Sequence, residues 1–287
     1  MPLPSVHFGL ATLVLDGWSG HPSHAPFPPY VEVNRNAFYQ GALGPDMGLF
    51  PGGEPLLSEM AHRHRPGDLA RALVDRARND EEHAFAWGWL THVIADVEIH
   101  PLINAHARRL VLAAGGDPDD EEALGVQHSR VELGLDVHVH LRDARVRRHR
   151  LVPCFDARSV EFLRGAYRAV YGLSLNPEWL LRSHRAVGRL AGALSMLERL
   201  HALAAPERRP RLRRRALRLL GRVAAMRLAP RSRAFLEPVA PTRALLRQLV
   251  DTAASFRETI RRHQVEGLVR LGNPDLEGMA VAELLSA

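Results

Sequence analysis

The chain has 287 residues, enough to bury a hydrophobic core without disulfide bonds or small-domain metal sites to hold it together. Its one cysteine, Cys154, excludes an intramolecular disulfide, a thiolate-built zinc finger and an iron–sulfur site, so any bound metal needs nitrogen and oxygen ligands. The net charge is +6 and every basic residue is arginine, which says little about partners unless the arginines cluster.

The N-terminus lacks the pattern of a secretory signal. Its apolar run follows no basic segment and is too short to span a bilayer. No uninterrupted apolar stretch of membrane length occurs elsewhere in the sequence. The expected location is therefore cytoplasmic.

Two loops rich in proline or glycine occur in the first 60 residues. Residues 19–34 are proline-rich and cannot form a regular helix, and residues 43–58 gather glycines and prolines around Asp46. Loops carried on a helical scaffold often position functional groups. A first helix is predicted after them, over residues 66–80, where apolar residues recur at helical spacing behind Pro66.

Two longer helices are predicted in the middle of the chain. Residues 81–101 begin with two acids, which suit the positive end of a helix. Pro101 is expected to end this helix, because proline disfavours helical geometry at the preceding residue, His100. Residues 119–143 begin with acids in the same way and predict another helix.

Helical patterns continue to the C-terminal part. Residues 176–205 predict a helix with Asn176 as its N-cap and Pro177 at its first position, and residues 242–271 form a long amphipathic run. Convincing alternating strands are absent, so the expected fold class is all-α. We expect residues 1–205 to form one helical domain and residues 206–287 an arginine-rich helical extension packed on it.

The stretch Arg208–Arg233 contains eleven arginines and an apolar stripe at helical spacing. Three interpretations are open: a core-packed helix with a solvated basic face, a peripheral helix on anionic lipid, or a nucleic-acid contact. Nucleic acid is the least favoured partner, because the stretch has no aromatic residue for base stacking.

Three ionisable residues interrupt the apolar helix of residues 81–101 at one spacing: His92, Asp96 and His100. Residues four apart drift by only about 40° around a helix axis, so they share a face. A single histidine on an apolar face is usually a hydrogen-bonded core residue. A carboxylate on the same stripe is costly unless a metal or partner compensates its charge.

A second helix repeats this spacing with His128, Glu132 and Asp136. One such pair arises often by chance, but two pairs on separate helices indicate a metal site. Imidazole and carboxylate together suit zinc.

An ordered set of histidines and carboxylates runs through residues 7–136. It comprises His7, Asp46, His62 (with His64 as the alternative), His92, Asp96, His100, His128 and Glu132. In order and residue type this set resembles the zinc-dependent phospholipase C family, which is related more distantly to the S1/P1 nucleases.

The resemblance implies an all-helical, phospholipase C/P1 nuclease-like domain with two or three zinc ions. By analogy, Asp46, His62, His92 and Asp96 would hold one ion, and His100, His128 and Glu132 a second with a position open for water. Asp96 would bridge to a third ion also bound by His7. Asp136 is either a residue that orients a ligand histidine or an acid on the helix surface.

The predicted function is hydrolysis of a phosphate diester, with zinc-activated water attacking phosphorus and Asp46 as ligand and general base. A phospholipid, or another phosphodiester, is the expected substrate. Two alternatives stay open: a single-strand nuclease, and a non-catalytic helical protein stabilised by zinc.

Overall fold

The computed structural model describes residues 5–142, 156–189 and 236–265, with scattered positions between 207 and 222. These described residues form helices and connecting loops and contain no β-strand, which confirms the predicted all-α class. None of the described helices is both long enough and apolar enough to cross a bilayer.

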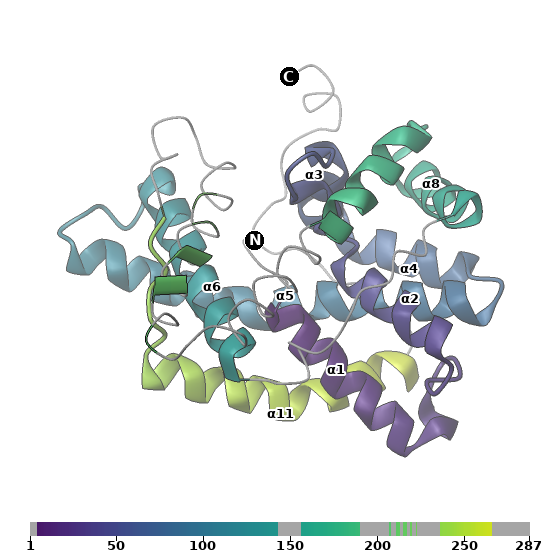
Figure 1. Ribbon diagram of the computed structural model, residues 1–287, viewed down its shortest axis with the longest axis horizontal. Helices are drawn as coiled ribbons and strands as arrows, with labels where there is room; N and C mark the ends of the chain where they lie inside the picture. The colour runs from purple at the N-terminus through teal and green to yellow at the C-terminus, as the bar shows by residue number, and fades with distance from the viewer. Residues whose placement is uncertain are drawn as a thin grey trace. The chain divides into compact units, whose positions relative to one another are not determined.

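Short helices occupy the first quarter of the chain (Figure 1). They are α1 (Ser5–Gly20), the 3₁₀ helix η1 (Pro22–His24), α2 (Glu32–Leu43), the 3₁₀ helix η2 (Met47–Leu49), α3 (Pro55–Arg63) and α4 (Pro66–Arg76). The two predicted loops are confirmed in outline, but each contains a single 3₁₀ turn. The first is shortened at both ends by α1 and α2, and the second is shortened at its C-terminal end by α3.

Four more helices follow: α5 (Asp80–Ala113), α6 (Glu121–Arg142), α8 (Ala157–Tyr171) and α11 (Arg243–Val265). A further helix begins at Pro177 and is described to residue 189. Its predicted N-cap is confirmed, because the Glu178 backbone N–H donates to Asn176 Oδ1 at 2.9 Å. Most of Arg208–Arg233 lies outside the described residues, so its three interpretations stay predictions.

The prediction that Pro101 ends its helix is wrong. α5 continues through Pro101 to Ala113, and His100 is helical. A proline inside a helix costs roughly 3 kcal/mol. Ile99 and Ile103, on either side of it, are both buried, and burial of each such side chain contributes roughly 1.5–3 kcal/mol. Tertiary burial therefore offsets the local cost.

The chain divides into two compact units, which we describe separately. The α2 unit comprises Leu10–Val97, Leu151–Leu190 and Ser255–Ala287, and the α6 unit comprises Met1–Gly9, Glu98–Arg150 and Ala191–Ala254. The predicted division into residues 1–205 and 206–287 stays a prediction.

Within the α2 unit, α2 and α5 approach closely through two glycines. A Cβ atom on Gly88 would overlap the Phe38 carbonyl oxygen, and one on Gly41 would overlap the Phe85 carbonyl oxygen. The two backbones therefore meet where larger residues would separate them. This contact brings the C-terminal end of α2 to the face of α5 that carries His92.

We expect Gly88→Ala to destabilise the fold by about 1–3 kcal/mol, because the new methyl group would push α2 away from α5. The control is Gly125→Ala in α6, where a Cβ would meet nothing within 4 Å. That variant should be neutral or more stable by up to about 1 kcal/mol through helix propensity. Denaturant unfolding of both variants measures the difference, and equal stabilities would contradict the packing argument.

In the α6 unit, the extended segment of residues 236–241 lies along α6. The Val239 N–H donates to the Arg130 carbonyl at 3.0 Å, and Arg130 Nε donates to the Glu237 carbonyl at 2.9 Å. A Cβ on Gly134 would overlap the Val239 carbonyl oxygen, so this segment also packs at backbone distance. These contacts hold the segment against the helix that carries His128 and Glu132.

Candidate metal centres

Three residues from separate elements of the α2 unit converge at one point. Asp46 precedes η2, His62 lies on α3 and His92 lies on α5, and one ligand atom from each lies within 4.8 Å of the others. His62 Nε2 is 3.3 Å from Asp46 Oδ1 and 3.2 Å from His92 Nε2. This geometry could hold a metal ion.

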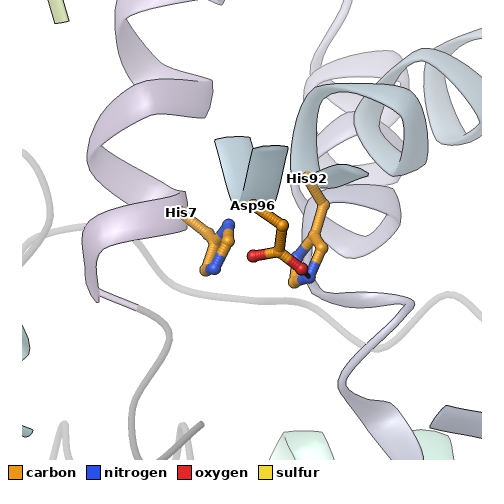
Figure 2. A group of neighbouring side chains, drawn as sticks. All are labelled: His7, His92 and Asp96. Carbon is orange, nitrogen blue, oxygen red and sulfur yellow. Dashed lines mark ion pairs between the residues drawn. The ribbon is translucent and has the colours of Figure 1, made fainter. Parts of the chain in front are cut away.

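Asp96 completes this set from the next turn of α5. Its Oδ2 atom lies 3.3 Å from His92 Nε2 and 3.5 Å from His62 Nε2. Figure 2 shows the Asp96 carboxylate beside the His92 ring. The structure thus brings together the four residues that the family resemblance assigned to one ion, which we call the Asp46 group: Asp46, His62, His92 and Asp96.

Backbone carbonyls determine which ring nitrogen each histidine presents. His62 Nδ1 lies 2.7 Å from the Ser58 carbonyl, and His92 Nδ1 lies 2.8 Å from the Ala42 carbonyl near the end of α2. A carbonyl only accepts, so each Nδ1 carries the proton and each neutral ring presents an Nε2 lone pair. The two Nε2 atoms lie 3.2 Å apart, so their lone pairs repel unless a cation or an added proton lies between them. The donor set therefore fits a zinc ion.

The charges in the Asp46 group also suit a cation. Burial raises the pKa of Asp46, but His92 and His62 outweigh it and hold the pKa of that carboxyl well below its usual range. Burial lowers the pKa of His92, but Asp96 and Asp46 outweigh it and raise the pKa above its ordinary value of 6.5. The Asp46 carboxylate thus stays ionised and favours a positive charge, either a proton or a metal ion, at His92.

A second set of ligand-type residues lies in the α6 unit, and we call it the Glu132 group: His100, His128 and Glu132. One ligand atom from each lies within 4.8 Å of the others. Glu132 Oε1 is 3.1 Å from His128 Nε2 and 3.4 Å from His100 Nε2. Burial raises the pKa of Glu132, but the two imidazoles outweigh it and hold the pKa well below its usual range.

Asn104 belongs to this site but was not among the predicted residues. Its Oδ1 accepts from His128 Nδ1 at 2.7 Å, so Nε2 is the atom that His128 contributes as a possible metal ligand. One signal could have found it: Asn104 follows His100 by four residues and shares its face of α5.

We expect Asn104→Leu to weaken zinc binding by the Glu132 group about 10–100-fold, because the His128 ring loses the acceptor that fixes its tautomer. Asn104→Asp keeps an acceptor at this position and should bind zinc nearly as well as the parent. Zinc titration against a competing chelator measures both variants. Equal losses in the two would show that Asn104 acts only through packing.

His7 and Asp136 both lie in the α6 unit. His7 is buried on the first turn of α1, where Figure 2 also draws it. Asp136 is buried too, so it is not an acid on the helix surface; its Oδ1 accepts the Val6 backbone N–H at 3.0 Å, one residue before His7. The third ion with His7 as a ligand stays a prediction, as does the role of Asp136 in orienting a ligand.

The structure favours His62 over His64 for the Asp46 group. α3 ends at Arg63, and the His64 backbone carbonyl accepts from the Tyr171 hydroxyl at 2.6 Å. Within the described part of the chain, His64 belongs to no group of residues with metal-ligand geometry.

The described residues form a helical fold in which histidines and carboxylates lie in geometry that could hold metal ions. The family model of zinc dependent phospholipase C matches residues 6–172, more than half of the chain, and the chain belongs to this family. Every residue of the Asp46 and Glu132 groups lies within the matched part. Searches of curated proteins and of solved structures found no match. Membership indicates a phospholipase C-like hydrolase of a zinc-dependent family.

Proposed function

We propose that this chain is a zinc-dependent hydrolase that cleaves the phosphodiester bond of a phospholipid. The observation that carries the proposal is the convergence of ligand atoms in the Asp46 and Glu132 groups, within a family of zinc-dependent phospholipases C. The burial of Asp46 and Glu132, and the hydrogen bonds that fix the tautomers of His62, His92 and His128, support metal binding rather than simple core packing.

We assign the candidate ligands to three ions. Asp46, His62, His92 and Asp96 would hold one ion, His100, His128 and Glu132 a second, and His7 with Asp96 a third. Bound zinc supplies Lewis-acid charge for phosphoryl oxygens and makes water a stronger nucleophile near neutral pH. The protein's part is to hold these ligands in place and to move a proton.

Asp46 is our candidate for the general base. It is 1% exposed, and its lowered pKa keeps it ionised at neutral pH, as a metal ligand must be. A carboxylate in this position would take the proton from an attacking water.

The proposal also includes a cytoplasmic location and peripheral contact of Arg208–Arg233 with anionic lipid, supported by the sequence pattern alone.

A side-by-side assay tests the substrate. Zinc-loaded protein would be incubated with phosphatidylcholine vesicles, with a soluble phosphodiester chromogen, and with single-stranded DNA and RNA, each with a chelated control. We expect chelator-sensitive diacylglycerol release and chromogen cleavage faster than nucleic-acid cleavage. Chelator-sensitive cleavage of nucleic acid without diacylglycerol release would instead identify a nuclease.

A further inference from the structure

The loop that carries Asp46 is folded tightly back on itself. Asp46 stands before η2, and its carbonyl accepts the Leu49 N–H at 2.8 Å. A Cβ on Gly48 would overlap the Glu54 carbonyl oxygen, so these two peptides are in direct contact. The position of Glu54 therefore helps to set the position of the Asp46 turn.

Ser58 connects this loop to His62. Its hydroxyl accepts the Gly48 N–H at 2.9 Å, and its backbone carbonyl accepts from His62 Nδ1 at 2.7 Å. The loop and α3 are thus joined at a residue that also orients a ligand histidine. A shift of the loop against α3 would change the distance between Asp46 and His62.

Glu54, the residue just before α3, is held from outside the loop. Its backbone N–H donates to Ser183 Oγ at 2.8 Å, and its Oε2 atom pairs with Arg182 Nη2 at 2.7 Å. Ser183 is 0% exposed, so its hydroxyl has no contact with bulk water. Both partners lie on the helix that begins at Pro177, beyond residues 6–172 that the family model matches.

We propose that Ser183 is a positioning residue for the metal site, which acts through Glu54 to fix Asp46 relative to His62, with Arg182 as its partner. The inference rests on the proposed function only in taking Asp46 as a metal ligand. Metal ligands must be held within roughly 0.5 Å of their working geometry, and residues behind the ligands typically set affinity by 10–100-fold. The helix from Pro177 therefore contributes to the geometry of the metal site, although the family model ends before it.

The test measures zinc affinity at each group separately. Ring signals of His62 and His92 report the Asp46 group, and those of His100 and His128 report the Glu132 group, in a zinc titration of the full chain followed by NMR. The variants are Ser183→Ala, which removes the acceptor of the Glu54 N–H, and Arg182→Gln, which removes the ion pair.

Each variant has a matched control. Ser159→Ala removes another serine that makes local hydrogen bonds, at the start of α8, where Ser159 binds Asp156. Arg185→Gln removes an ion pair with Glu178 on the same helix as Arg182. Arg182 and Arg185 are both about half exposed, so these two variants should fold even if Ser183→Ala does not.

We expect Ser183→Ala to weaken zinc binding at the Asp46 group about tenfold, and Arg182→Gln a few-fold, with less than a twofold change at the Glu132 group. The controls should leave both affinities unchanged. Equal weakening at both groups would indicate a general loss of structure and overturn the inference, as would no change at either. If Ser183→Ala does not fold, the comparison of Arg182→Gln with Arg185→Gln decides by the same criterion.

This outcome is separable from that of the proposed function. A parent chain that binds no zinc at the Asp46 group overturns both. Selective weakening in a chain that cleaves no phospholipid supports the positioning role and rejects only the substrate.

Discussion

Replacing His92 with alanine is expected to abolish hydrolysis and to remove zinc from the Asp46 group. The side chain is buried, and its Nε2 atom faces Asp96 Oδ2 at 3.3 Å and Asp46 Oδ1 at 4.0 Å. Without the imidazole, the two carboxylates lose a partner, and the Ala42 carbonyl loses its donor. Loss of one ligand from a buried site should lower the rate by several orders of magnitude, as measured with a soluble phosphodiester chromogen.

His106→Ala is the matched control, because His106 is also buried on α5. Burial, with a smaller effect of Arg109, lowers the pKa of His106, and His106 belongs to no group with metal-ligand geometry among the described residues. Its loss should lower the melting temperature and leave the zinc content unchanged. If His92→Ala retained near-normal turnover, or if both variants lost zinc equally, the site would be misplaced.

Removal of zinc is expected to lower the melting temperature, and by more at higher pH. Zinc binding to the folded chain alone stabilises it by about 2.7 kcal/mol when free zinc is one hundred times the dissociation constant. Zinc needs the neutral form of His92, whose pKa in the metal-free chain is raised above its ordinary value of 6.5. Protons therefore compete with zinc until the pH exceeds that raised pKa.

The stabilisation by zinc grows as the pH rises, whereas the contribution of His92 to the stability of the metal-free chain should decrease. Protonated His92 stabilises the folded state fully below about pH 6.5, and this contribution is lost as the pH rises through the raised pKa. Calorimetry of the chain with and without zinc, from pH 6 upwards, measures both trends. A metal-free chain that melts at the same temperature as the zinc-loaded chain at every pH would contradict this expectation.

The spacing of residues predicted which ionisable side chains share a helix face, because helical spacing is a local property. His92 and Asp96 lie one turn apart, and the structure places their side chains together as that spacing requires. The convergence of Asp46 and His62 on the same point comes from loop and helix packing, which spacing cannot give. There the prediction depended on the family resemblance.

The failures have physical causes. The rule that proline ends a helix considers only local geometry. α5 continues through Pro101 because the burial of Ile99 and Ile103 offsets the cost of the proline. The structure favours His62 over His64, as expected, but spacing alone left this choice open, because it depends on where α3 ends and on contacts such as the Tyr171 bond to the His64 carbonyl, more than 100 residues away. Ser183 holds Glu54 across 129 residues of sequence, and no local pattern marks such a pair.

The most direct test of the account is the rate of phosphodiester hydrolysis as a function of zinc bound per chain. Metal-free protein would be titrated with zinc, with elemental analysis and chromogen hydrolysis measured on the same samples. We expect a binding ratio of about two to three and a rate that rises only as the Asp46 and Glu132 groups fill. Full activity of the metal-free chain, or saturation with zinc without hydrolysis of any phosphodiester, would contradict it.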